Sequence, residues 1–186
     1  PYGPLRASPV NYLEGNFGGL RRTTRHLQLL GGGHQGAGMV AQTGGSIIRD
    51  MYLKELSVHS GNKLDVGGLV GQNGGIIVNA SVEGNVSGIN GFAEVGGVVG
   101  ANQGIIELSR AGAAVSASGD NGLPGGLGGA NFGFIDRSYA TNAVSAAESR
   151  GGPTGAMGGR GGGGVWGGGR GGGGGGGGWR GGGGGC

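Results

Sequence analysis

The sequence predicts an all-β protein: a right-handed parallel β-helix (solenoid) of about four coils with a 29-residue period, followed by a disordered glycine-rich tail. Three observations lead to this prediction. One motif recurs along the chain, apolar residues recur in register with it, and the composition changes abruptly near residue 150. Internal repeats of about 20–50 residues are typical of stacked solenoids, in which each unit buries its apolar face against its neighbours.

The repeat is carried by a glycine-rich motif. VGGLVGQNGG occupies residues 66–75, VGGVVGANQG follows at 95–104 and PGGLGGANFG at 124–133, each 29 residues after the one before. A degenerate copy, GAGMVAQTGG, precedes them at 36–45. We therefore divide the chain into lead-in or cap strands at 1–35, four repeats at 36–65, 66–94, 95–123 and 124–146, and a tail at 147–186.

Aligning the copies places apolar residues in three columns. These are Met39, Leu69, Val98 and Leu127; Ile47, Ile77, Ile106 and Ile135; and Leu56, Val86, Val115 and Val144. The segments that carry them are short, rich in β-branched residues and interrupted by glycine, which favours strands over helices. We expect three short strands in each coil, with Ile77, Ile106 and Ile135 buried and superposed at the inter-strand spacing of roughly 4.8 Å.

Two polar columns accompany them. Asn73, Asn102 and Asn131 share one position, which Thr43 occupies in the degenerate copy, and stacked amides at this position would form a hydrogen-bonded ladder along the solenoid axis. Ser57, Ser87, Ser116 and Ser145 would form a second ladder. The alternative is that these are ordinary turn residues. The glycine pairs mark sharp bends or close backbone approaches, since no phosphate-binding glycine motif is present.

The repeat VGGLVGQNGGIIVNASVEGNVSG resembles the GLUG-type repeat of bacterial surface and secreted proteins, and residues 95–117 and 124–146 match the same pattern. Such repeats occur in filamentous-haemagglutinin-like adhesins and in non-catalytic parts of immunoglobulin-A-type peptidases. The segment at 16–30 resembles the strands that often precede them, with Arg21 and Arg22 where a Gly-His pair is common. The resemblance implies a β-helical stalk in a large exported protein, without a catalytic site.

The two ends of the chain differ from the repeats. Residues 1–15 are expected to be irregular, and 16–35 to supply one or two strands that cover the open end of the solenoid. The segment 151–186 contains 25 glycines in 36 residues, so it is expected to have no regular structure. It reads as a flexible linker, as an RGG-type nucleic-acid-binding segment, or as a translated nucleotide repeat that is not native.

The charge of the chain argues against nucleic-acid binding by the folded part. The net charge is +3, from 13 basic and 10 acidic residues, and removing the tail arginines Arg160, Arg170 and Arg180 leaves ten of each. The single cysteine, Cys186, excludes a disulfide framework, and no apolar run is long enough to span a membrane. Because the chain begins with Pro1, we expect it to be a fragment of a longer protein.

No catalytic, cofactor or metal site is expected, and the chain is interpreted as a non-enzyme. Glu107 and Asp136 share a column on adjacent coils, with Ile48 and Val78 as its upstream members, and are the one pair that a carbohydrate-active β-helix could use. His26, His34 and His59 are scattered, without metal-ligand spacing.

The favoured function is therefore a structural and binding segment of an exported bacterial adhesin-like protein, secreted or at the cell surface, with a host or surface glycan or protein as its partner and the oligomeric state left open. The alternatives are a non-catalytic spacer of a secreted zinc peptidase and a carbohydrate-active β-helix.

Overall fold

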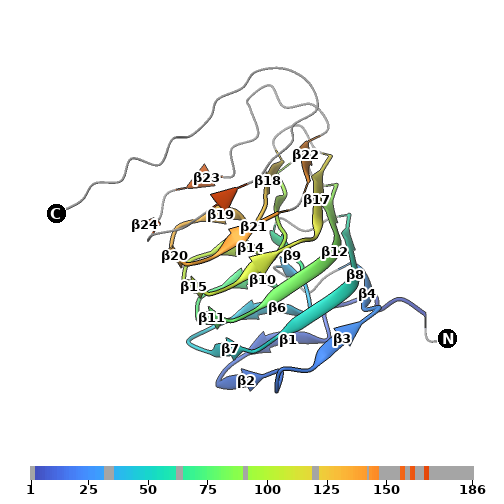
Figure 1. Cartoon of the computed structure of the whole chain (residues 1–186). Coiled ribbons are helices and arrows are strands. Elements are labelled where there is room, and N and C mark those ends of the chain that lie inside the picture. The colour runs from blue at the N-terminus through green and yellow to red at the C-terminus, as the bar shows by residue number, and fades with distance from the viewer. Residues whose placement is uncertain are drawn as a thin grey trace.

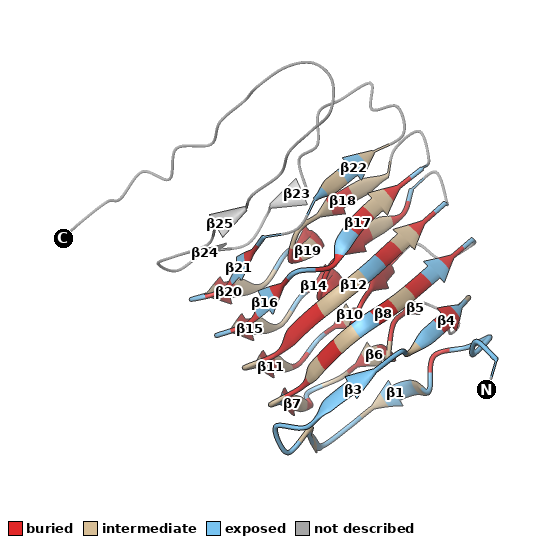
Figure 2. Cartoon of the chain, turned by 45° about the vertical axis from the view of Figure 1, so that its right-hand side comes forward, coloured by how far each residue is buried: buried red, intermediate tan, exposed pale blue. Residues whose placement is uncertain are grey.

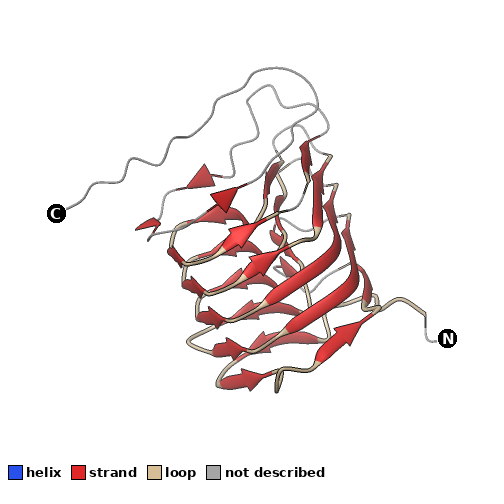
Figure 3. Ribbon diagram, in the orientation of Figure 1, coloured by secondary structure: helices blue, strands red, loops and turns tan. Residues whose placement is uncertain are grey.

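The structure, a computed structural model, describes residues 3–31, 36–61, 65–89, 92–118, 122–141 and 143–146, together with the backbone of 156–157, 160–161 and 166–167. These residues contain strands and no helix, and every strand pair is parallel (Figures 1 and 3). Figure 1 shows successive coils stacked along one axis, from blue β1–β3 at one end to orange β20 toward the other. The predicted all-β parallel solenoid of about four coils is confirmed.

Each of the four repeats contributes to four sheets. The glycine sheet comprises β5 (Gly36–Ala37), β9 (Asp65–Gly67), β13 (Glu94–Gly96) and β18 (Leu123–Gly125). The asparagine sheet comprises β1 (Val10–Leu13), β6 (Val40–Thr43), β10 (Val70–Asn73), β14 (Val99–Asn102), β19 (Gly128–Asn131) and β23 (Ala156–Met157). The isoleucine sheet comprises β2 (Asn16–Gly18), β7 (Ile47–Arg49), β11 (Ile76–Val78), β15 (Ile105–Glu107), β20 (Phe134–Asp136) and β24 (Arg160–Gly161).

The long sheet carries the longest strands. It comprises β3 (Thr23–Arg25), β4 (Gln28–Leu30), β8 (Tyr52–Ser60), β12 (Ser81–Gly88), β16 (Arg110–Ala111), β17 (Ala114–Ala117), β21 (Tyr139–Ala140), β22 (Val144–Ala146) and β25 (Trp166–Gly167). Figure 2 shows buried and exposed residues alternating along β8 and β12, because successive side chains of a strand point to opposite faces. One face of each strand therefore supplies the core.

The expectation of three strands in each coil was wrong, because the glycine pairs themselves lie in or next to strands. The glycine sheet folds back on the asparagine sheet with the two backbones in contact. A Cβ atom on Gly67 or on Gly96 would lie 1.9 Å from the carbonyl oxygen of Val70 or Val99. Only glycine fits at such an approach, so the column is a consequence of packing.

The core is a thin stack of aliphatic side chains. Ile77 and Ile106 are fully buried and Ile135 nearly so, and strand pairing places the three in one column. Val86 and Val115 are also buried and pair in the same way on the long sheet, as the columns predict. Each coil thus buries its apolar residues against the same residues of the next coil.

The first repeat is out of register with the prediction at two places. Ile48, not Ile47, lies in the buried isoleucine column, because Ser46 is an additional residue before β7. Val58, not Leu56, pairs with Val86. The two-residue shift is the sum of the additional Ser46 and of a β-bulge between β8 and β12 at Glu55, which has a positive φ of 54°.

The same two shifts change the predicted serine column. His59 takes the place of Ser57 opposite Ser87, while Ser87, Ser116 and Ser145 remain in register.

The N-terminal segment is more regular than expected. Strands β1 to β4 extend three of the four sheets by one strand position, so that residues 10–30 form a coil. β1 lies in the segment expected to be irregular, and the segment at 16–35 supplies three strands instead of one or two. This coil is also the most exposed: all three residues of β3 are solvent-exposed (Figure 2).

The glycine-rich tail contains three two-residue strands, β23 to β25, which pair with β19, β20 and β21. At these positions the expectation of no regular structure was wrong. The rest of 147–186 lies outside the described residues.

Candidate functional site

The asparagine column forms a continuous hydrogen-bonded ladder. Asn73 Nδ2 donates to Asn102 Oδ1 at 2.8 Å, and Asn102 Nδ2 donates to Asn131 Oδ1 at 2.7 Å. Thr43 Oγ1 donates to Asn73 Oδ1 at 2.9 Å. Because all three asparagines are buried, these bonds replace the water that the amides would otherwise bind.

The ladder also holds the corner between the asparagine and isoleucine sheets. The Asn73 side chain both donates to the carbonyl oxygen of Gly75 and accepts from its N–H group, each at 3.2 Å. The ladder and the buried Ile77, Ile106 and Ile135 column therefore contribute to stability, and they offer no exposed group to a ligand.

The Glu107 and Asp136 pair lies on the outer face of the isoleucine sheet. The two residues are neighbours on β15 and β20, and Arg137 Nε donates to Asp136 Oδ2 at 2.8 Å. The upstream neighbours in this column are Val78 and Arg49, so the predicted Ile48 was wrong, for the reason of the additional Ser46 given above. The column therefore holds two carboxylates on adjacent coils, with Arg49 two coils before Glu107.

The histidines contact single neighbours. His26 Nδ1 lies 2.7 Å from Glu55 Oε2, and His59 Nδ1 lies 2.8 Å from Ser87 Oγ. His34 lies outside the described residues. Within the described part of the chain, no three His, Cys, Asp or Glu side chains gather closely enough to hold a metal ion.

A different carboxyl pair, Asp65 and Glu94, lies at the start of the glycine sheet. Sequence reasoning missed it. The two residues are partners on β9 and β13, and their side chains share a hydrogen bond. Gln72 Nε2, on the asparagine sheet, donates to Asp65 Oδ2. The pair therefore lies where the two sheets begin to fold against each other.

Burial is the main cause of an altered acidity in this pair. It raises the pKa of Asp65, an effect that the hydrogen bonds from Gln72 and Glu94 partly offset. Burial, together with the charge of Asp65, raises the pKa of Glu94 from 4.5 to about 7. The pair holds a proton near neutral pH. The signal available in the sequence was an acidic residue directly before Val66 and Val95, 29 residues apart.

The outer face of the long sheet is polar and crossed by a row of ion pairs. Arg25 pairs with Glu55 at 3.2 Å, and Lys54 and Arg110 both pair with Glu83, at 3.5 and 2.5 Å. These exposed pairs contribute little to stability, since water and salt screen them. They do link successive coils across one surface.

Short polar side chains continue this face next to the ion pairs. Ser87 and Ser116 are superposed, and Asn85 is exposed beside them on β12. Two tyrosines, Tyr52 and Tyr139, lie along its other margin, in one strand-paired column. We define the outer face of β8, β12, β16 and β17 as the polar face.

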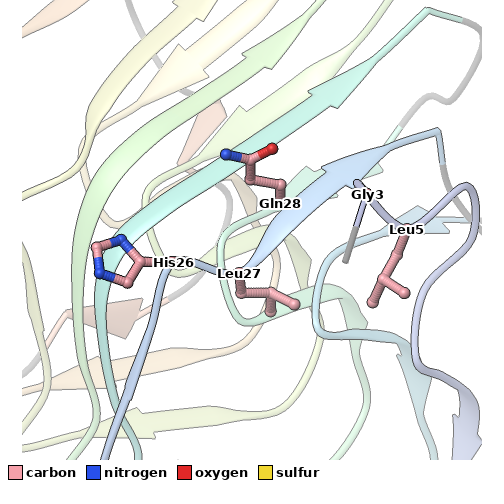
Figure 4. Close-up of a pocket in the computed structure, with 5 residues that line it drawn as sticks. All are labelled: Gly3, Leu5, His26, Leu27 and Gln28. Atoms are coloured by element: carbon pink, nitrogen blue, oxygen red, sulfur yellow. The ribbon is translucent and has the colours of Figure 1, made fainter. Parts of the chain in front are cut away.

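A small pocket of about 300 Å³ lies at the N-terminal coil, lined by Gly3, Leu5, His26, Leu27 and Gln28 (Figure 4). In Figure 4 the His26 ring is turned away from the Leu5 and Leu27 side chains. Of the five lining residues, Gly3, Leu5 and Leu27 carry no polar side-chain group, so the wall of the pocket is mainly apolar.

Comparison with known families gives one match. The family model described as the GLUG motif matches residues 64–87, which contain β9, β10, β11 and β12 except for its last residue. No curated protein and no solved structure matches the chain. In the part of the chain that the structure describes, no helix has the length and apolar character needed to cross a bilayer.

The match covers most of one coil: Val66 and Gly67 of the glycine sheet, Asn73 of the ladder, Ile77 of the core and all but the last residue of the polar strand β12. The sequence resemblance is thereby confirmed for this repeat. Residues 64–87 are a GLUG motif in a stack of like coils, consistent with a GLUG-repeat protein whose repeats form a structural domain.

Proposed function

We propose that this structural repeat domain is part of an exported bacterial adhesin-like surface protein and that its polar face contacts a glycan or a protein. The observation that carries the proposal is the polar face itself. In-register stacking presents the same short polar side chains at intervals of roughly 4.8 Å, a surface that matches an extended partner.

Three properties of the polar face support a binding role. Its charged side chains, such as Lys54, Glu83 and Arg110, already form ion pairs with one another. A partner that covers the face would therefore bury paired charges and not isolated ones. Asn85 and Ser116 carry both donor and acceptor groups, whereas the Ser87 hydroxyl contacts His59 and donates to the Val58 carbonyl oxygen. Tyr52 and Tyr139 add aromatic area, which is enriched in recognition surfaces.

Binding is tested with the full chain on arrays of glycans and of extracellular-matrix proteins. Asn85→Arg and Ser116→Arg place bulk on the polar face, and Gln103→Arg places the same group on an exposed corner elsewhere. The expected result is loss of binding in the first two variants and unchanged binding in the third. Equal binding by all three, or no bound component, would refute a binding role for this face.

Export is tested separately. Antibodies raised against the chain should label intact source cells, and the label should disappear after protease treatment of those cells while a cytoplasmic marker survives. Labelling only after cell lysis would refute surface exposure, whatever the arrays report.

A further inference from the structure

Two short motifs in the second repeat have the sequence of an asparagine-linked glycosylation acceptor, which is Asn-x-Ser or Asn-x-Thr without proline in the middle. They are Asn79-Ala80-Ser81 and Asn85-Val86-Ser87, and the sequence contains no other. Motifs this short also occur by chance, so the surroundings of each asparagine decide which one can carry a sugar.

Asn85 lies at an open position on the polar face. It is exposed on β12, and its side chain forms no hydrogen bond within the described part of the chain. Its partners on the neighbouring coils are Ser57 and Ala114, which both have short side chains. Because adjacent strands lie only about 4.8 Å apart, short neighbours on both sides leave room for a bulky group on the Asn85 amide.

The rest of this motif also suits a modified asparagine. Ser87 lies on the same outer face as Asn85, since residues two apart in a strand point the same way, and Val86 between them is buried in the core. The amide and the hydroxyl that define the motif therefore both lie outside the core. A sugar on the amide displaces no apolar residue.

Asn79 lies at a closed position. Its Nδ2 donates to Asp50 Oδ1 and to the Tyr52 hydroxyl, the latter at 3.0 Å, so both N–H groups of the amide are in use. It lies at the corner between β11 and β12 with a positive φ of 53°, and Ser81 of the same motif is buried. A sugar on Asn79 would break these contacts and is incompatible with the folded coil.

We propose that Asn85 is a site of asparagine-linked glycosylation and that the folded chain carries no sugar on Asn79. This inference goes beyond the proposed function and rests on its export part, because such glycosylation marks the surface of secreted proteins.

The transfer step needs a sugar that is activated by a diphosphate and a transferase. The Asn85 amide nitrogen attacks C1 of the sugar, and the new C1–N bond replaces the C1–O bond. The diphosphate leaves with the electron pair of that bond, and a base of the transferase takes the amide proton. No oxidant or reductant takes part.

The pairing of β12 sets the order of events. Its backbone is hydrogen-bonded to β8 on one side and to β16 and β17 on the other, so a transferase cannot draw the folded strand into an active site. Transfer therefore precedes stacking, when both motifs are accessible. Folding then retains the chains whose sugar is on Asn85.

The site is tested by peptide mass spectrometry on the protein isolated from its source cells. Cleavage after glutamate separates the motifs, because it releases residues 56–83 with Asn79 and residues 84–94 with Asn85. The expected result is a sugar on Asn85, assigned by electron-transfer fragmentation, and none on Asn79. An unmodified 84–94 peptide, or a sugar on Asn79 of the folded protein, would overturn the proposal.

Three variants expressed in the source cells are the matched controls. Ser87→Ala should abolish the sugar although Asn85 is intact, and Ser87→Thr should retain it, because either hydroxyl completes the motif. Ser81→Ala should also retain it: this change removes the second motif, and the Ser81 hydroxyl has no hydrogen-bond partner among the described residues. A sugar that survives in Ser87→Ala would contradict the assignment. Circular dichroism of the purified variants checks that each of them folds.

The peptide experiment and the surface labelling have separate outcomes. Surface label together with an unmodified Asn85 refutes the glycosylation site and leaves export in place. A sugar on Asn85 without surface label refutes surface exposure and leaves the site in place. The arrays are probed with chain made in a host that lacks such a transferase, so that no sugar covers the polar face in the binding measurement.

Discussion

Glu94 should make the stability of the fold depend on pH near neutrality. Its pKa is raised to about 7 from 4.5, so between these values the folded chain binds a proton that the unfolded chain releases. Stability should therefore be highest below about pH 4.5 with respect to this group, decrease as the pH rises, and level off above pH 7. Glu94→Gln keeps a hydrogen-bonding group beside Asp65 and removes this proton uptake.

The size of the effect follows from the two pKa values. The pKa of Glu94 rises from 4.5 to about 7, and each pKa unit corresponds to about 1.4 kcal/mol. The upper limit of the change in unfolding free energy is therefore about 3 kcal/mol. Glu94 is only partly buried and water screens its charge, which reduces the expected value to about 1–2 kcal/mol. For a chain of this length that is a rise in Tm of roughly 2–8 °C for Glu94→Gln at pH 8.

The assay is urea unfolding followed by circular dichroism at intervals from pH 5 to pH 8. The parent chain should lose stability across this range, and Glu94→Gln should show a flatter profile and be the more stable at pH 8. Glu107→Gln is the matched control, because it neutralises a glutamate on the same coil that lies on the outer face. Equal profiles for parent and Glu94→Gln would refute the assignment of proton uptake to this pair.

Three further predictions test the stacking. Asn102→Ala should cost about 2–4 kcal/mol because it removes the two buried hydrogen bonds that the Asn102 side chain makes with Asn73 and Asn131, whereas Asn85→Ala on the exposed face should change the unfolding free energy by less than about 0.5 kcal/mol. Gly96→Ala should prevent folding or cost more than about 4 kcal/mol, since the new Cβ would lie 1.9 Å from the Val99 carbonyl oxygen. Gly45→Ala is the control and should be tolerated, because no atom lies within 4 Å of its Cβ position. The yield of soluble protein distinguishes the two variants. Ile48→Ala should cost about 2–5 kcal/mol in chemical denaturation and Ile47→Ala less than about 1 kcal/mol; the reverse order would mean that the register of the first repeat is wrong.

Most of the fold could be predicted from the period alone. Where spacing is a strict 29 residues, as for Ile77 and Ile106, alignment in sequence is equivalent to pairing in space. It fails in the first repeat, because an additional Ser46 and a bulge at Glu55 each shift the alignment by one residue. In a strand, a shift of one residue exchanges the buried and exposed faces.

The candidate site was less predictable. Asp65 and Glu94 lie outside the apolar and polar columns that the alignment defines, and their altered acidity results from burial, which spacing does not reveal. The glycine sheet was missed because strand propensity depends on side chains and glycine has none. Gly67 and Gly96 occupy strand positions because the neighbouring backbone leaves no room there for a Cβ atom.

The asparagine ladder has a direction. Asn73 and Asn102 each accept from the coil before and donate to the coil after, and Asn131 accepts from Asn102, so the row of side chains is ordered head to tail. It begins with the hydroxyl of Thr43, whose upstream partner Leu13 has no polar group, and ends at Asn131, whose next partner is Met157. If a further 29-residue unit were inserted between these limits, its asparagine would accept a hydrogen bond from the coil before it and donate one to the coil after it. The protein can therefore change its length by whole coils in the middle of the stack, while its two ends remain fixed by residues that do not propagate the row.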